Sequence, residues 1–283
     1  MNKKILFIDS ASIFNRFKLD KKENYLPSLL NLLKDVVDEL KPTDAFIVVG
    51  EKSHQRSKLM PSYRKHPKLK ESDTEVIAEL TEVWEKSHKA LEFVKMYIPM
   101  PVLKSPFWET KDVMSYMKYE IEKTSEEQPE FIVVTNDDDF LGLDGIEVYD
   151  FVQKDFLKKP TYNYWKYKAL VGDKKLNVKG VPGVPKKKIA DITKNSKTIR
   201  EFLDTCDTDQ QDAYNLNYKV LSPFCGTAPE NFVIYKDGTD CFDFAAFIME
   251  HSRTLEEHIE DPFEFSEVFR KISKKKETTG GMF

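Results

Sequence analysis

Three consecutive carboxylates, Asp137, Asp138 and Asp139, directly follow a run of apolar residues in the stretch FIVVTNDDDF. Adjacent like charges repel one another, and removing them from water costs several kcal/mol unless something compensates. A bound cation is one source of such compensation. A solvated turn is the alternative, because Asn and Asp favour turns and helix N-caps.

Further acidic residues lie where other apolar runs end. The run KKILFIDS reaches Asp9, and DAFIVVGEK reaches Glu51. Glu109 and Asp112 are three residues apart at the start of a helical pattern, so their side chains can share one face. Oxygen ligands without Cys or His favour Mg²⁺ or Mn²⁺. The sequence therefore predicts a carboxylate cluster that binds one of these ions.

Other common site motifs are absent from the sequence. A calcium loop that began at Asp137 would place Leu141, which is no ligand, at its fifth position. The chain contains no GxxxxGKS/T phosphate loop, no HExxH and no GxSxG, and its five histidines are scattered. The carboxylates remain the candidate reaction centre.

The scaffold for these carboxylates is an alternation of strand and helix patterns. Short, β-branched or aromatic runs that are apolar on both faces lie at 3–10, 44–52, 97–104, 131–139 and 146–152. Helical patterns lie at 25–42, 73–98 and 109–123. This alternation predicts an α/β fold with a parallel sheet and right-handed crossovers. Ligands of such sheets bind beyond the carboxyl ends of the strands, where the acids lie.

The longest helical pattern has apolar residues at three- and four-residue steps, which predicts one apolar helix face. These residues are Ile77, Leu80, Trp84, Leu91, Val94 and Ile98.

The bulk composition is that of a globular protein in a reducing compartment. The chain has 283 residues, 40% of them hydrophobic, and three cysteines that form no CxxC pair, which argues against a structural zinc. No signal peptide precedes the first strand pattern, and no apolar stretch approaches the ~20 residues of a membrane span. We expect a soluble, cytoplasmic protein with no membrane partner.

Positive charge is concentrated in two segments, although the net charge is −4. Residues 52–70 contain seven Lys and Arg and no acid, and residues 174–188 contain six Lys and no acid. These segments predict local contacts to a polyanion, and solvated lysine-rich loops are the alternative.

The second basic segment includes a glycine turn. Gly180 and Gly183 permit a tight turn, and Pro185 suits the first position of a helix that continues through Lys186 and Lys187. Such a helix start offers backbone N–H groups and positive charge to a phosphate. An ordinary turn between two helices is the alternative.

Taken in order, these motifs resemble those of the 5′-nuclease family, which includes flap endonucleases, phage 5′–3′ exonucleases and the 5′-nuclease domain of bacterial DNA polymerase I. The resemblance covers roughly residues 3–190 and rests on five stretches: LFIDSASIFNRF, VVGEKSHQRSKLMPSYRK, WETKDV, TNDDDF and VGDKKLNVKGVPGVPKKK. They are similar to the family's first acidic motif, its strand-end acid with Arg and P-x-Y-K, its E-A-D-D, its S-x-D-x-D and its helix–three-turn–helix.

The resemblance implies a PIN-like parallel-sheet core over residues 1–160, with a helical arch at about 56–98 that admits a free 5′ end. A helical region with the helix–three-turn–helix follows over 161–273. We expect a disordered tail at 274–283, whose terminal Met-Phe is a candidate hook for a sliding clamp. We also expect a monomer in the cytoplasm of a bacterial or phage-infected cell.

Two metal sites are implied by the resemblance. The first would use five carboxylates: Asp9, Glu51, Glu109, Asp137 and Asp139. Asp137 and Asp139 alternate along the chain, so both can face the metal while Asp138 turns outward. The second site would keep only Asp139, Asp173 and Asp112.

Departures from the family pattern fall on the second site. Lys111 occupies the third position of E-A-D-D, and Leu176 the second Asp position of G-D-x-x-D, while Pro185 replaces a glycine of the turn. We expect Lys111 to replace the second metal as a fixed positive charge, so that one Mg²⁺ or Mn²⁺ binds tightly. The alternative is an exposed Lys111 that only balances Glu109 and Asp112.

The reaction implied by the resemblance is hydrolysis of a phosphodiester bond by metal-activated water, which leaves a 5′-phosphate. Arg56, Arg64 and Lys111 are the expected catalytic cations, with Arg64 at the scissile phosphate. Tyr63 would stack on a base, and Lys65 would contact DNA.

The glycine turn would hold duplex DNA, around a potassium ion as in some relatives, through Gly180, Gly183, Lys186 and Lys187. The expected substrates are 5′ flaps and branched or 5′-ended DNA, with roles in replication and repair. One alternative is a DNA-binding protein of the same fold that has lost turnover. Another is a PIN-type ribonuclease, although the long basic arch and the helix–turn–helix argue against it.

Overall fold

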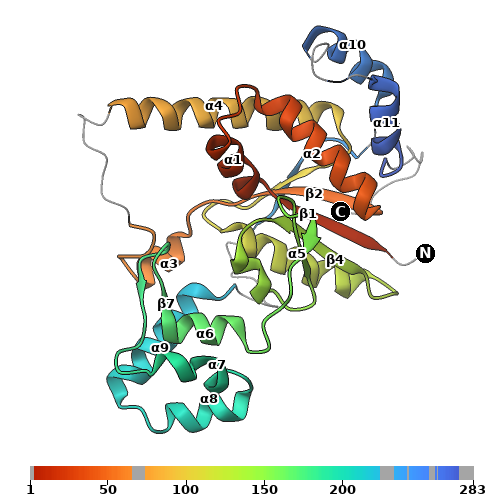
Figure 1. Cartoon of the computed structure of the whole chain (residues 1–283). Coiled ribbons are helices and arrows are strands. Elements are labelled where there is room, and N and C mark those ends of the chain that lie inside the picture. Colours follow the sequence, from red (N-terminus) through yellow and green to blue (C-terminus); the bar gives the residue numbers. More distant parts are fainter. Residues whose placement is uncertain are drawn as a thin grey trace.

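The computed structural model describes residues 3–65, 74–223, 233–240, 242–254, 259 and 261–273 (Figure 1). Its centre is a seven-stranded sheet in the order β6-β5-β4-β1-β2-β3-β9. The parallel strands are β1 (Lys4–Asp9), β2 (Asp44–Val49), β3 (Val102–Lys104), β4 (Glu130–Thr135) and β5 (Glu147–Asp150). At the edges, β6 (Asp155–Phe156) and β9 (Tyr235–Asp237) run antiparallel. The expected α/β fold with a parallel core sheet is confirmed.

The register of the central strands aligns their carboxyl ends. Asp9 of β1 pairs with Val48 of β2, and Ile8 pairs with Val134 of β4. The residues that follow these three strands therefore leave the sheet at the same edge.

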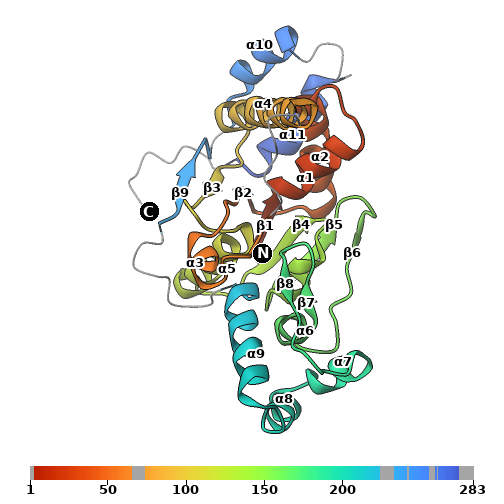
Figure 2. The same cartoon turned by 90° about the vertical axis from the view of Figure 1, so that its left-hand side faces the viewer.

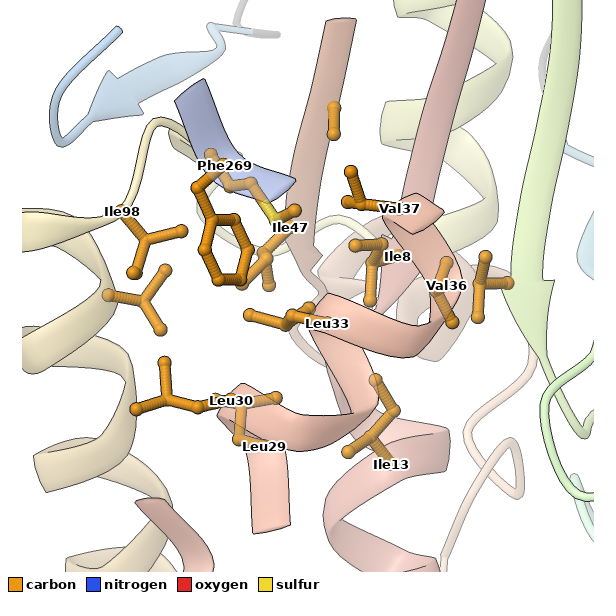
Figure 3. Packing of buried hydrophobic residues seen from close by; sticks show 14 of the residues in the cluster. Ile8, Ile13, Leu29, Leu30, Leu33, Val36, Val37, Ile47, Ile98 and Phe269 are labelled. Carbon is orange, nitrogen blue, oxygen red and sulfur yellow. The ribbon is translucent and has the colours of Figure 1, made fainter. Parts of the chain in front are cut away.

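One face of the sheet is covered by helices from both ends of the chain (Figures 1 and 2). They are α1 (Ser10–Leu19), α2 (Tyr25–Leu40), α4 (Thr74–Tyr97) and α11 (Pro262–Arg270), while α10 (Phe244–Thr254) packs on α4 and α11 farther from the sheet. Figure 3 shows Ile8 and Ile47 of the sheet close to Leu33 of α2 and Phe269 of α11. These buried contacts fix the sheet from which the candidate site projects.

The opposite face of the sheet packs against α5 (Thr110–Thr124). Ile5 and Phe7 point to this face, because alternate residues of a strand lie on opposite sides. The glycine that follows β2 lets the start of α5 come close: a Cβ on Gly50 would lie 2.3 Å from the backbone nitrogen of Thr110.

A smaller helical region lies on the α5 side of the sheet, away from α1, α2 and α4 (Figures 1 and 2). Its elements are α6 (Tyr164–Val171), β7 (Gly172–Asp173), β8 (Val178–Lys179), α7 (Ile189–Ile192), α8 (Ser196–Leu203) and α9 (Thr208–Leu221). Its apolar core is its own and includes Leu170, Ile189 and Tyr214.

Gly172 shapes this region, because its φ of 82° favours glycine and a Cβ would lie 2.3 Å from the nitrogen of Gly180. The turn directs the next residue, Asp173, back towards α6.

The apolar face expected along 73–98 is buried only in its second half. Ile77, Leu80 and Trp84 are 42%, 45% and 65% exposed, so the expectation is wrong for them. Phe93 and Val94 are buried. The reason is that the first half of α4 projects beyond the sheet (Figure 1), so Ile77, Leu80 and Trp84 are outside the core cluster of the described residues.

Besides residues 224–232, 241, 255–258 and 260 of the helical region expected at 161–273, two further expectations fall partly or wholly outside the described residues. The arch at 56–98 includes residues 66–73, and the tail at 274–283 with its clamp hook lies outside altogether. Among the helices of the described part, none is long and apolar enough to cross a membrane.

Candidate active site

Five of the seven expected metal ligands line one cavity at the carboxyl ends of the central strands. The cavity measures about 150 Å³, and its acidic residues are Asp9, Glu51, Glu109, Asp137 and Asp139. Arg64, Lys52 and Lys111 also line it. Asp112 and Asp173 do not, so the structure places them outside the cluster in which they were expected.

Asp9 is the most deeply desolvated acid of the cavity. It is 3% exposed, and its Oδ2 accepts hydrogen bonds from Ser12 (2.6 Å) and Thr135 (3.0 Å). Its Oδ1 is buried and has no hydrogen-bond partner among the described residues. Burial raises the pKa of Asp9 to about 6, since these hydrogen bonds offset the loss of water only in part.

The triple Asp forms the start of a short 3₁₀ helix, η1 (Asp138–Gly142). Asp138 is exposed, whereas Asp137 and Asp139 are half-buried, as the alternation predicts. Asp137 Oδ1 accepts a hydrogen bond from the nitrogen of Asp139 (3.2 Å). The nearest cation to Asp137 is the exposed Lys175, 3.7 Å from Oδ1. Asp137 therefore keeps most of its capacity to bind a cation.

Glu109 is buried among cationic and hydroxyl donors. Its Oε1 accepts from Tyr63 (2.6 Å) and lies 3.1 Å from Arg64 Nε. Its Oε2 accepts no hydrogen bond from any described residue, although Arg56 and Lys111 each lie 3.4 Å away. Burial alone would raise the pKa of Glu109, but these cations hold it below its usual value.

Arg56, on α3 (His54–Leu59), does not face the cavity. Its guanidinium forms a bidentate pair with Asp112 and donates to the carbonyl of Ser222 (2.8 Å). Asp112 is fully buried and also accepts from the nitrogen of Glu109 (3.3 Å). The expectations that Arg56 is catalytic and Asp112 a metal ligand are therefore not supported by their placement. Each is held by the other and by a backbone group, although the buried Nε of Arg56 has no hydrogen-bond partner among the described residues.

Lys111 is 5% exposed, so the alternative of an exposed Lys111 is wrong. Its ammonium donates to the carbonyl of Leu221 (2.7 Å) and lies 4.9 Å above the ring of Trp165. Burial and Arg56 lower its pKa, against the opposing effect of Glu109. Lys111 reaches the cavity wall but is held by the end of α9.

Lys168 is the site residue that the sequence analysis missed. Its ammonium lies 3.1 Å from Asp139 Oδ1 and forms a short ion pair with Asp173 Oδ2. Burial alone would lower the pKa of Lys168, but the two carboxylates more than offset this and raise it. In the sequence, the only signal that could have identified Lys168 was its position on the helix just before Gly172-Asp173.

Glu51 forms an ion pair with Lys104 (2.8 Å) and accepts from the nitrogen of Phe107 (3.1 Å). Lys104 lowers the pKa of Glu51. This acid is paired at the rim of the cavity.

The expected DNA-binding residues are split between the interior and the surface. Tyr63 is 1% exposed, so the expectation that its ring stacks on a base is wrong for this conformation. The Arg64 and Lys65 side chains are exposed. Gly183 has a φ of 74°, which fits the expected tight turn, while Gly180 packs against the carbonyl of Val171.

The lysines after the glycine turn are exposed but do not start a long helix. Lys186 and Lys187 lie in a single 3₁₀ turn, η2 (Lys186–Lys188), which is followed by the four residues of α7. The expected lysine-rich helix is thus wrong in its form. A solvent-facing cluster of positive charge remains.

Lys and Arg side chains form ion pairs with most of the carboxylates that were expected to bind metal. Among the described residues, no group of three or more acidic, histidine or cysteine side chains is arranged to hold a metal ion as it stands. Asp112, Asp139 and Asp173 are each paired with a Lys or Arg, as described above. In the part of the chain that the structure describes, the buried Asp9 Oδ1 and Glu109 Oε2 accept no hydrogen bond, and the exposed Lys175 lies 3.7 Å from Asp137 Oδ1.

The fold is similar to that of solved nucleases. Bacteriophage T5 5′-exonuclease with bound zinc has a TM-score of 0.60 at 16% identity, over 77% of this chain and 88% of that chain. The T5 flap endonuclease in a pseudo-enzyme-product complex with DNA and metal ions has a TM-score of 0.59 at 16% identity and the same coverage. Human GEN1 in complex with Holliday junction DNA has a TM-score of 0.54 at 14% identity, over 95% of this chain and 72% of that chain. No protein-family model and no curated protein matches this sequence.

Proposed function

Because this chain has the PIN-like fold of the 5′-nucleases, we propose that it is a structure-specific nuclease. It would hydrolyse phosphodiester bonds of 5′ flaps and of branched or 5′-ended DNA with Mg²⁺ or Mn²⁺. The observation that carries this proposal is the pair of buried carboxylate oxygens, Asp9 Oδ1 and Glu109 Oε2, that accept no hydrogen bond from a described residue. Both residues line the cavity at the strand ends. Leaving buried oxygens unsatisfied is costly, so a ligand that satisfies them is expected.

The donor set of the cavity fits a hard divalent cation. Asp9, Glu109 and Asp137 would hold the ion, with Glu51 at the rim, and all four supply oxygen. When bound, the ion activates water and neutralises charge on the reacting phosphate. Glu109 already lines the cavity, and the bound ion would compete with Arg56, Arg64 and Lys111 for its carboxylate.

Arg64 is the cation best placed to meet the scissile phosphate. Its side chain is 42% exposed, lines the cavity and touches Glu109 through Nε. Its backbone nitrogen donates to the carbonyl of Leu176 (2.8 Å), which fixes the chain at this point. A guanidinium presents paired N–H donors that suit phosphate oxygens in a bidentate manner.

Duplex DNA would be held by the exposed lysines of η2, which follow the glycine turn. The T5 enzyme and GEN1 have been crystallised with DNA, which supports DNA as the partner. A potassium ion at the glycine turn, a monomeric state and a clamp contact stay predictions.

The test is cleavage of an end-labelled 5′-flap substrate with Mg²⁺ or Mn²⁺, beside DNA binding in EDTA. Asp137→Asn should abolish hydrolysis and leave binding in EDTA intact or improved, because one negative charge near the phosphate is gone. Asp138→Asn is the matched control, since this neighbour faces solvent. Wild-type turnover in Asp137→Asn would contradict the proposal.

A second candidate function is DNA binding without turnover. The pairing of Asp112, Asp139 and Asp173 with protein cations favours it, because a two-metal mechanism would need such groups free. Tight flap binding with no cleavage by the wild-type protein in either metal would establish this candidate. Cleavage of the RNA version of the substrate alone would instead indicate a ribonuclease.

A further inference from the structure

Lys168 bridges two carboxylates in the way that a shared cation would. Its Nζ lies 3.1 Å from Asp139 Oδ1 and is directly paired with Asp173 Oδ2. The two acids come from separate elements, one after β4 and the other at the end of the helical region's first hairpin strand. The ammonium therefore links the sheet to the helical region at the edge of the cavity.

Two further protein donors reach this pair of acids, one of them at an oxygen that Lys168 already contacts. Tyr164 donates to Asp139 Oδ1 (2.9 Å), and the nitrogen of Leu176 donates to Asp173 Oδ1 (3.0 Å). Asp173 is 5% exposed. Three of the four carboxylate oxygens thus have a donor supplied by the chain itself, which a divalent ion would have to displace.

The ammonium of Lys168 is held in place by its own helix. It lies 5.7 Å above the ring of Tyr164, one helical turn earlier on α6, and its side chain is only 20% exposed. The N-cap residue of this helix is Asn163, whose side-chain oxygen accepts a hydrogen bond from Lys166 N (3.0 Å). Lys168 itself does not line the cavity, whereas Asp139 and the buried Lys111 do.

We propose that Lys168 is the resident cation of the Asp139–Asp173 pair and takes the place of a second divalent ion. The protein would then bind one exchangeable divalent ion, at Asp9, Glu109 and Asp137. This inference rests on the proposed metal-dependent function. It moves the role expected of Lys111 to Lys168, because Lys111 is tied to a backbone carbonyl. Lys168 is a positioning residue: it acts by fixing two carboxylates and excluding an ion.

The test counts Mn²⁺ ions bound to the full-length protein without DNA. The number of bound ions is measured by calorimetry and by the loss of the electron paramagnetic resonance signal of free Mn²⁺. The wild type should bind one ion, and Lys168→Met should bind two, because a neutral side chain of similar length leaves both carboxylates available. Lys168→Arg keeps the charge and should bind one.

Lys175→Met is the matched control, since Lys175 lies 3.7 Å from Asp137 but is 79% exposed. It should bind one ion, like the wild type. Thermal unfolding gives an independent readout: Mn²⁺ should raise the Tm of Lys168→Met by more than that of the wild type.

This inference would be overturned if the wild type bound two ions. It would also be overturned if Lys168→Met bound one ion and its Tm rose with Mn²⁺ only as much as that of the wild type. Either result would leave the proposed nuclease function intact. If Lys168→Met does not fold, the counts for the wild type and Lys168→Arg decide the question. Failure of both to bind Mn²⁺ would remove the proposed metal site and the inference together.

Discussion

Arg56 and Asp112 form a buried bidentate ion pair, in which Arg56 Nη2 lies 2.7 Å from Asp112 Oδ1. The two residues are 56 positions apart, and their side chains are 5% and 0% exposed. The pair joins α3 to the first turn of α5. It occupies the two groups for which the motifs imply catalytic and metal-binding roles.

Asp112→Asn should lower stability sharply and leave metal affinity unchanged. The change leaves the Arg56 guanidinium buried without its charged partner, which costs about 3–5 kcal/mol in comparable cases. Thermal unfolding measures the first effect and Mn²⁺ titration the second. Lys197→Ala, at an exposed pair with Glu201, is the control and should hardly change Tm. If Asp112→Asn lost Mn²⁺ affinity while its stability stayed unchanged, Asp112 would be a metal ligand, against this prediction.

Asp9→Asn should stabilise the metal-free protein at neutral pH. Burial raises the pKa of Asp9 from 3.8 to about 6, so the folded state binds its proton more tightly than the unfolded state does. The wild type should therefore lose about 3 kcal/mol of stability as pH rises from about 4 to above 6. The variant lacks this loss, so its advantage should be large at pH 7.5 and absent at pH 4.

Thermal unfolding in EDTA across this pH range measures the effect. The exposed Asp138→Asn is the control and should show no such trend. A Tm difference for Asp9→Asn that does not change with pH would show that Asp9 is not desolvated as described.

Tyr63→Phe should reduce stability without reducing DNA affinity. The hydroxyl of Tyr63 donates to Glu109 Oε1 (2.6 Å), and a hydrogen bond to a charged group contributes about 1.5–3 kcal/mol. Denaturant unfolding and binding to a 5′-flap in EDTA are the two measurements. If Tyr63→Ala weakened DNA binding while the fold stayed intact, the result would support a base-stacking role and contradict this prediction.

Replacing Lys186 and Lys187 with Ala should weaken duplex binding and reduce its dependence on salt. Each lost phosphate contact lowers the slope of log K against log salt by roughly 1, so the expected fall is about 1–2. Fluorescence anisotropy over a salt series measures it. Lys271→Ala, at the end of α11 on the other side of the sheet, should leave the slope unchanged. An unchanged slope in the double variant would remove the glycine turn from the interface.

The strands and the acids that follow them could be predicted from sequence, because both signals are local. Short apolar runs define β1, β2 and β4, and parallel register then brings Asp9, Glu51 and Asp137 to one edge. The alternation of Asp137 and Asp139 about an exposed Asp138 also follows from local geometry.

The pairing of the carboxylates could not be predicted, because it depends on residues distant in sequence. Nothing near Asp112 indicates that Arg56 will saturate it. Lys168 looks like any lysine of a short helix until Gly172 turns Asp173 back towards it. The exposure of Trp84 was missed for a similar reason, since spacing defines a helix face but does not show where the core beneath it ends.

Helix α9 sets the distance between the glycine turn and the residues Lys111 and Arg56. Near its start, Gln210 donates to the carbonyl of Pro182 in the glycine turn (2.9 Å), and at its end the carbonyls of Leu221 and Ser222 accept from Lys111 and Arg56. Its 14 residues span about 21 Å. That length corresponds to roughly six base-pair steps of duplex. Under the proposed function, α9 would set the distance between the turn that binds duplex DNA and the site that cleaves it. The cleavage position would then lie at a fixed distance from the bound duplex, whatever the base sequence.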